Sequence, residues 1–210
     1  MVYGFARGVL LVLSKMLFRI KISGTENVPT SGVYIVAPSH RSYFDTPFAS
    51  FITRRRIRFM AKEELFKNSF GAKLFLALGG IPVTRGSASA RGATKAVEAA
   101  LRAGEPAAVF PEGTRAHGPT IAPLFDGTAY LSVKLGCPIV PVAIGGSETI
   151  LASGRKLPKL HRVSMRVGVP IMPPADASTR RRNDLVAISD ELMKSLQSLF
   201  DAANADVDVA

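Results

Sequence analysis

The sequence predicts an α/β fold: a single domain in which a mixed, largely parallel β-sheet is covered by helices. The chain has 210 residues, 47% hydrophobic and 20% charged, so one domain can bury a substantial core. Short runs rich in β-branched residues alternate with segments of helical periodicity. No internal repeat, low-complexity tract or linker divides the chain. We expect an N-terminal amphipathic helix over residues 1–22, the main domain over 23–204 and a frayed tail over 205–210.

The N-terminal segment, residues 1–22, has the pattern of a basic amphipathic helix. Its longest charge-free stretch, Gly8–Ser14, is far shorter than the ~20 apolar residues that a spanning helix needs, and no signal-peptide cleavage site follows it. On a helical wheel, the polar residues gather on one side: Arg7, Ser14, Lys15 and Arg19. Apolar residues recur at spacings of three and four on another side: Phe5, Val9, Leu13, Met16 and Ile20. Such a helix either packs on the core or lies in the headgroups of an anionic membrane, and different residues can do each.

The alternating pattern predicts the elements of the main domain. The predicted strands are Val33–Ala37, Ile57–Met60, Ile81–Val83, Ala107–Phe110, Ile139–Ile144 and Val163–Val169. The predicted helices are Phe44–Thr53, Ser69–Leu78, Ala88–Ala103 and Gly127–Leu135. A final helix is indicated by an apolar stripe at helical spacing: Leu185, Ile188, Leu192, Leu196 and Leu199.

The charge of the chain indicates an anionic partner. A formal net charge of +11 and a pI near 10.2 attract phosphate, acidic lipid and nucleic acid alike, and the cluster Arg54–Arg58 adds to this field. Cys137 is the only cysteine, so no intrachain disulfide can form and nothing favours an oxidising compartment. Cys137 heads an apolar run, which favours a small buried residue over a nucleophile.

The strongest chemical signal is the segment Ser39–Asp45, which directly follows a predicted strand. Ligand sites in open α/β sheets lie beyond the carboxyl ends of strands. Within one helix, residues five apart would be separated by about 140°, so His40 and Asp45 can meet only across a turn. We expect His40 in the loop and Asp45 in the first turn of the next helix, where the carboxylate fixes the imidazole tautomer and leaves the other nitrogen as a base. The alternative is a polar loop in which Asp45 only caps the helix.

Three further segments lie in or directly after predicted strands. Phe110–Arg115 combines a glycine, which permits close backbone approach, with an arginine that can hold a phosphate. Gly79–Arg85 again brings an arginine to the exit of a strand. Pro138–Val142 has a proline inside an apolar strand, which suggests a sheet edge or a bulge. Taken singly, the first segment also fits an ordinary turn and the second a solvated surface arginine. The third fits an edge strand or a bulge.

In this order the four segments resemble the sequence blocks of the glycerolipid acyltransferases typified by lysophosphatidic acid acyltransferase. The His-x4-Asp block is matched by His40 and Asp45, and the Phe-Pro-Glu-Gly block by Phe110–Gly113; the other two blocks resemble Gly79–Arg85 and Cys137–Val142. The resemblance implies a phospholipid-synthesising O-acyltransferase. Its donor would be acyl-CoA or acyl carrier protein and its acceptor a hydroxyl of glycerol 3-phosphate or the 1-acyl form, with another lysophospholipid or alcohol as the alternative acceptor.

The resemblance also implies a role for each site residue. His40 would be the catalytic base and Asp45 its partner, while Pro141 would shape the site. The residues implied to hold the phosphorylated acceptor are Arg85, Glu112, Gly113, Thr114 and Arg115. Two positions depart from the family: Ser39 replaces the usual asparagine, and Asp126 stands where many relatives carry a lysine, which leaves the acceptor preference open.

This chemistry needs one base and no metal or other cofactor. We expect oxyanion donors among the backbone amides near the start of the helix after His40. His117 and His161 are too isolated in the sequence to indicate a ligand cluster. The N-terminal helix and the arginine cluster predict a peripheral enzyme on the cytoplasmic side of an anionic membrane.

Two other classes compete with this interpretation. A serine hydrolase could use Ser39 or Ser42, but the chain has no Gly-x-Ser-x-Gly elbow. A nucleic-acid-binding protein would explain the charge, but no binding motif accompanies it. Both are therefore weaker than the acyltransferase interpretation.

Overall fold

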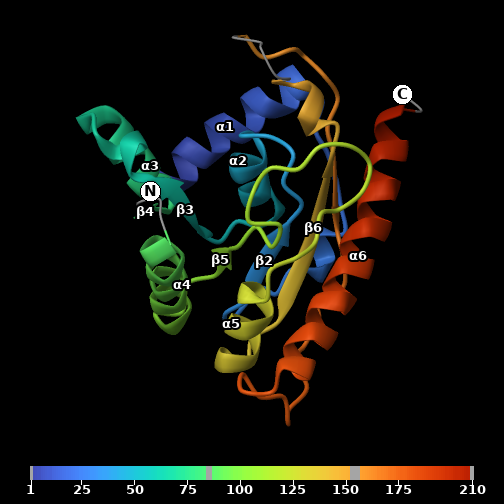
Figure 1. Ribbon diagram of the computed structural model, residues 1–210. Coiled ribbons are helices and arrows are strands. Elements are labelled where there is room, and N and C mark those ends of the chain that lie inside the picture. Colours follow the sequence, from blue (N-terminus) through green and yellow to red (C-terminus); the bar gives the residue numbers. More distant parts are fainter. Residues whose placement is uncertain (1, 84–86, 152–156, 209–210) are drawn as a thin grey trace.

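The protein is a seven-stranded sheet covered by helices (Figure 1). The structure, a computed structural model, describes residues 2–83, 87–151 and 157–208. Its strands are β1 Lys21–Ser23, β2 Ile35–Pro38, β3 Arg58–Lys62, β4 Gly80–Val83, β5 Ala107–Ala108, β6 Ile139–Gly145 and β7 Ser164–Val167. Its α-helices are α1 Val2–Phe18, α2 Asp45–Ala49, α3 Ser69–Leu78, α4 Ser87–Arg102, α5 Gly127–Leu135 and α6 Arg182–Asp208. Short 3₁₀ helices lie at η1 Thr25–Asn27, η2 Ser50–Ile52, η3 Glu63–Phe66 and η4 Ser147–Thr149.

The sheet is mixed and largely parallel, as predicted. Its strand order is β1-β7-β6-β2-β5-β3-β4. The five strands from β6 to β4 are parallel, β7 is antiparallel to β6, and β1 is parallel to β7. Because β2 lies between β6 and β5, the loops that leave the carboxyl ends of these strands meet at one edge of the sheet.

Helices pack on both faces of the sheet, and the residues of β6 alternate between them. Val140, Val142 and Ile144 join the core cluster that contains Phe18 and Phe48, from the α1 and α2 side. Ile139 and Ala143 join the cluster formed by buried residues of α6: Leu185, Ile188, Leu192, Leu196 and Phe200. Leu199, the last residue of the predicted stripe, is only partly buried against this cluster. Figure 1 shows α6 along the length of β6. A strand covered on both faces is apolar throughout, which explains the unbroken apolar run in the sequence.

Most predicted elements are confirmed, and the differences have local causes. The predicted helices Ser69–Leu78 and Gly127–Leu135 match α3 and α5. The predicted helix Phe44–Thr53 is two short pieces, α2 and η2. Strand β1 was not predicted, because its three residues carry no periodic signal and are paired only by β7.

The N-terminal helix is shorter than predicted. It ends at Phe18, because Arg19 adopts a left-handed φ of 46°. Ile20, assigned above to the apolar stripe of the helix, is instead buried in the core. Residues 21–23 then form β1, so the expected boundary after residue 22 is wrong: it would cut a strand of the main sheet.

The expected frayed tail is also wrong for its first residues, since α6 continues through Ala205 to Asp208. Asp206 holds the end of this helix on the sheet. Its carboxylate accepts two hydrogen bonds of 2.9 Å from Arg166 and one of 2.9 Å from Ser164, both on β7. Residues 209 and 210 lie outside the described residues.

Of the two alternatives that the sequence suggests for Pro141, a sheet edge or a bulge, the structure excludes the edge. It lies in β6, between β2 and β7, and is paired with Ala37. Its carbonyl accepts a hydrogen bond of 2.9 Å from Gly168, one residue beyond the end of β7. The β6–β7 ladder begins at Val142, so the missing proline N–H falls just outside that ladder.

The arginine cluster lies at the amino-terminal end of the parallel strands, whereas the predicted site lies at their carboxyl-terminal end. It precedes β3, whereas His40 follows β2, which runs in the same direction. Arg55 donates to the Gly32 and Gly104 carbonyls, Arg56 to Leu76, and Arg58 lies 3.6 Å from Glu105. Only Arg54 of this cluster is in the exposed class. The expectation that the whole cluster faces lipid is therefore not supported by its contacts.

Candidate active site

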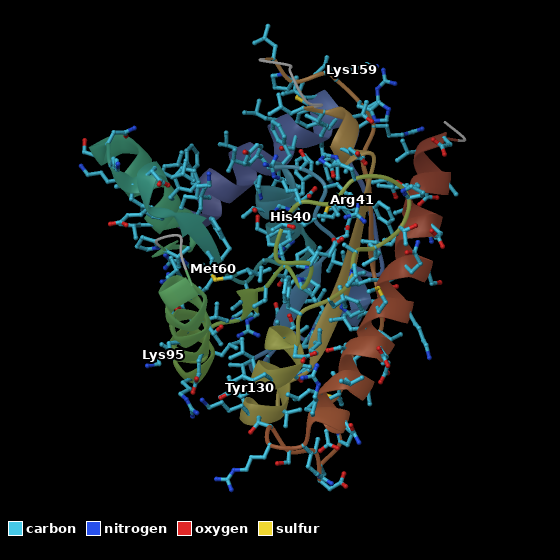
Figure 2. The ribbon with its side chains drawn as sticks, viewed as in Figure 1. His40, Arg41, Met60, Lys95, Tyr130 and Lys159 are labelled. Carbon is cyan, nitrogen blue, oxygen red and sulfur yellow. The ribbon has the colours of Figure 1, made fainter. Side chains whose placement is uncertain are left out.

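The loops that follow β2 and β5 converge beyond the carboxyl ends of these strands. β2 leads into His40, and β5, which pairs with β2, leads into Phe110–Arg115. A hydrogen bond joins the two loops: the N–H of Ala116 donates to the His40 carbonyl at 2.9 Å. Figure 2 shows His40 and Arg41 together among these loops at the upper end of the sheet. The sheet thus unites two segments separated by about seventy residues in the chain.

His40 and Asp45 meet across the turn, as predicted. The Nδ1 atom of His40 lies 3.2 Å from Oδ2 of Asp45, whose side chain is fully buried. The backbone N–H groups of Arg41 and Ser42 donate to the same oxygen at 2.5 and 2.6 Å. The imidazole ring also stacks on Phe110, with 4.1 Å between centroids. One ring nitrogen therefore faces a fixed carboxylate, and the other is left for a proton of a ligand.

Several backbone amides near the start of α2, where oxyanion donors are expected, are already occupied. The N–H groups of Arg41 and Ser42 already donate to Asp45. Those of Phe44 and Asp45 donate to the hydroxyl and the carbonyl of Ser42. These four amides next to the start of α2 therefore have partners inside the loop.

Glu112 holds the two loops together from inside the protein. One carboxylate oxygen, Oε1, accepts the backbone N–H of His40 at 2.8 Å. The other, Oε2, accepts the Arg41 guanidinium at 2.7 Å and the Ala122 N–H at 2.9 Å. Both side chains of the Arg41–Glu112 pair are almost completely buried. Arg41 also donates to the Thr120 carbonyl at 2.9 Å and lies 4.8 Å from the ring centre of Phe200 on α6.

Gly113 is required by the shape of this loop. Its φ of +68° is a left-handed conformation that side chains rarely adopt. A Cβ atom there would also lie 2.7 Å from the Phe125 ring. The neighbouring Thr114 is exposed, and its N–H donates to the Glu112 carbonyl at 2.8 Å. The absence of a side chain at Gly113 thus lets the Phe125 ring approach the backbone closely.

Arg115 is exposed and lies over Tyr43 of the histidine loop. Its guanidinium carbon is 3.7 Å from the Tyr43 ring centre, and its NH2 group donates to the tyrosine hydroxyl at 3.0 Å. Tyr43 stands between His40 and Asp45 in the chain. The structure therefore brings a solvent-facing cation to the same loop as the histidine–aspartate pair.

The other predicted site residues are distributed differently. Arg85 lies outside the described residues, as does the side chain of Arg7. Pro141 is buried in β6, and β6 meets the histidine loop through Ser39, whose N–H donates to the Val142 carbonyl. Arg41 and Tyr43 were missed because each is one polar residue in a polar loop, and their partners lie seventy or more positions away.

Ser39 and Ser42 have structural roles. Both are buried; the Ser39 hydroxyl accepts the Ile144 N–H at 3.0 Å, and the Ser42 hydroxyl accepts the Phe44 N–H at 3.4 Å. Cys137 is buried as predicted, and burial raises the pKa of its thiol to about 11. Across residues 2–83, 87–151 and 157–208, no group of three or more His, Cys, Asp or Glu could hold a metal ion.

Such a pair, an imidazole on a buried carboxylate next to an exposed arginine, can remove a proton from a hydroxyl of an anionic molecule. A family model described as acyltransferase matches residues 19–145, more than half of the chain, and includes both loops. The chain belongs to the acyltransferase family. The nucleic-acid-binding and serine-hydrolase interpretations are thereby replaced.

Named relatives agree with the acyltransferase assignment. The chain is 25% identical over 198 residues to the 1-acyl-sn-glycerol-3-phosphate acyltransferase of Bacillus subtilis, covering 94% of this chain and 96% of that one. It is 26% identical over 192 residues to the Bos taurus 1-acyl-sn-glycerol-3-phosphate acyltransferase alpha, covering 90% of this chain but 65% of that longer protein. The crystal structure of the 1-acyl-sn-glycerophosphate acyltransferase PlsC from Thermotoga maritima has the same fold: its TM-score is 0.72 at 23% identity, over 97% of this chain and 82% of that chain.

Proposed function

We propose that this acyltransferase transfers a fatty acyl group from a thioester donor to the free hydroxyl of 1-acylglycerol 3-phosphate in phospholipid biosynthesis. The observation that carries the proposal is the His40–Asp45 pair at 3.2 Å, bonded to the loop that presents Arg115. The names of the relatives favour this acceptor. Both acyl-CoA and acyl carrier protein supply the required thioester.

The proposed reaction uses His40 as a general base. Its Nε2 takes the proton of the acceptor hydroxyl while that oxygen attacks the thioester carbonyl carbon. Collapse of the tetrahedral intermediate breaks the C–S bond, and the imidazolium returns the proton to the leaving thiolate. General-base catalysis of this kind contributes about 10²- to 10⁴-fold to the rate. Asp45 fixes the tautomer and stabilises the imidazolium.

The acceptor phosphate is assigned to arginine. Arg115 is exposed beside the histidine loop, and a guanidinium forms strong charge-assisted hydrogen bonds with phosphate. By resemblance we assign Arg85 a second contact. Glu112 has a different role in our proposal: both of its carboxylate oxygens accept hydrogen bonds from protein groups, so it positions the His40 backbone and does not contact the phosphate.

A product analysis tests this proposal. Purified protein would be incubated with labelled acyl-CoA or acyl carrier protein and four acceptors: glycerol 3-phosphate, 1-acylglycerol 3-phosphate, monoacylglycerol and a lysophospholipid with a larger headgroup. We expect labelled phosphatidic acid as the main product, and none with His40→Ala. Equal use of monoacylglycerol would contradict the assigned role of the phosphate.

We further propose that α1 associates with an anionic membrane from the cytoplasmic side. Leu10 and Leu11 pack against the core and Phe18 is buried in it. Phe5 and Met16 are 76% and 75% exposed, and Val9, Val12, Leu13 and Leu17 are also exposed. Lys15 and Arg19 are exposed, and we assign them contacts with acidic headgroups. No helix within the described residues has the length and hydropathy required to span a bilayer.

Vesicle sedimentation tests the membrane proposal. Leu13→Glu with Met16→Glu should reduce binding to anionic vesicles even at low salt, because it removes apolar contact. High salt should weaken wild-type binding by screening the basic residues. The matched control is Val169→Glu with Met172→Glu, an equal charge change at residues 71% and 60% exposed after β7. Equal losses in both double variants would mean that charge alone reduces binding and that α1 is not the membrane contact.

A further inference from the structure

The contact between Tyr43 and Arg115 is the strongest feature of the site that the proposed chemistry leaves unused. We infer that Tyr43 is a positioning residue: its ring and hydroxyl hold the Arg115 guanidinium at a fixed place relative to His40, and so help to select a phosphorylated acceptor. This inference rests on the proposed function, because it gives Arg115 the phosphate as its ligand.

The geometry of the contact is specific. The Arg115 guanidinium carbon stands 3.7 Å above the Tyr43 ring centre, the distance of a stacked cation–π pair. Its NH2 group also donates to the Tyr43 hydroxyl at 3.0 Å. This single hydrogen bond uses one of the five donors of the guanidinium. The remaining donors are available for the paired contacts that a phosphate accepts.

Core packing does not explain this contact. Tyr43 is 57% exposed and Arg115 is also in the exposed class. Ordering a long exposed side chain costs conformational entropy, and an exposed arginine would otherwise sample many rotamers. A guanidinium already held on a ring has lost that freedom before the ligand arrives, so less binding energy is lost when phosphate binds.

Tyr43 itself stands on a rigid loop. The N–H of the preceding Ser42 donates to Asp45, and Asp45 begins α2. On the other side of the contact, Ala116, next to Arg115, donates to the His40 carbonyl. Both partners are therefore attached to the backbone that carries His40. A phosphate on Arg115 would be held at a set distance from the base, which is the positioning that bimolecular transfer requires.

Steady-state kinetics with 1-acylglycerol 3-phosphate and a saturating thioester donor test the inference. Tyr43→Ala should raise the acceptor KM roughly 3- to 30-fold, the range expected for loss of a cation–π contact, and leave the donor KM unchanged. Tyr43→Trp, which keeps a ring beneath the cation, should restore most of the loss. Tyr43→Phe should fall between them. Tyr130→Phe is the matched control, since Tyr130 lies under Lys134 on α5, away from the site.

A double-mutant cycle separates a role through Arg115 from a general effect on the loop. In the Arg115→Ala background, Tyr43→Ala should raise the acceptor KM no further. If the two changes multiply, or if Tyr43→Ala lowers kcat and leaves the acceptor KM unchanged, the inference is overturned while the proposed function stands. A wild-type enzyme that uses monoacylglycerol as well as its phosphate would overturn the proposed acceptor, and the role of Tyr43 with it.

Discussion

Replacement of Glu112 by glutamine tests whether this residue positions the histidine loop or contacts the acceptor. The carboxylate accepts three donors: the His40 N–H on one oxygen, and Arg41 with the Ala122 N–H on the other. A glutamine has one oxygen for these two positions. Whichever way the amide turns, its NH2 group faces another donor, and the buried Arg41 guanidinium loses its counter-charge.

The loss of stability expected for Glu112→Gln follows from the burial of the Arg41–Glu112 pair. The side chains of Arg41 and Glu112 are 1% and 0% exposed, and breaking a buried ion pair by changing one partner costs roughly 3 to 5 kcal/mol. For a protein of this size, this lowers Tm by roughly 6 to 20 °C. Because the His40 backbone is one of the partners, kcat should also fall, by roughly 10- to 100-fold for a small misplacement of the base.

Thermal unfolding and acceptor kinetics provide the assay. Glu98→Gln is the control, since Glu98 also accepts two cations, Arg102 and Lys134, but on the surface of α4. This control should change Tm far less than Glu112→Gln does. A Glu112→Gln protein with wild-type Tm and kcat but a raised acceptor KM would refute our reasoning and make Glu112 a direct acceptor contact.

Three other predictions concern single side chains. His40→Ala should lower kcat by roughly 100-fold or more with little change in Tm. Asp45→Asn should lower both kcat and Tm, because the Asp45 carboxylate also accepts two backbone N–H groups. Normal turnover by folded His40→Ala protein would exclude His40 as the base. Cys137, with a pKa of about 11, should resist alkylation at neutral pH until the protein unfolds, and rapid reaction of the folded protein would contradict its burial. The hydrogen bonds from Arg166 lower the pKa of Asp206 below its ordinary value of 3.8. The ionised Asp206 carboxylate should therefore stabilise the protein fully above pH 3.8, and this stabilisation should be lost as the pH falls below 3.8. Asp206→Asn should remove this part of the dependence of Tm on pH.

The sequence predicted the periodic elements well because their signals are local. Helices α3 and α5 match their predicted bounds, since apolar spacing within ten residues or fewer determines which face is buried. The end of α6 was mispredicted for the opposite reason. Asp206 is stabilised by Arg166 on β7, forty residues earlier, and no pattern near the C-terminus encodes that partner.

The N-terminal helix shows both outcomes within one element. Its helical periodicity was evident from spacing, and residues Val2–Phe18 are helical, while the membrane role of the apolar stripe stays a prediction. The assignment of Ile20 to that stripe was wrong, because the left-handed Arg19 ends the helix and directs the chain into the sheet. A backbone conformation at one residue, selected by sheet pairing, overrides the helical wheel.

The sequence by itself determined the fold class, the order of most elements and the meeting of His40 with Asp45, because these two residues are close in the chain and only one turn can join them. Tertiary structure alone decided what surrounds that pair. Glu112 reaches the His40 backbone, and Arg115 reaches Tyr43, only because β5 pairs with β2 and brings their loops to one edge of the sheet. The physical reason is that hydrogen bonds between distant residues depend on strand order, which the local pattern of apolar and polar residues does not specify.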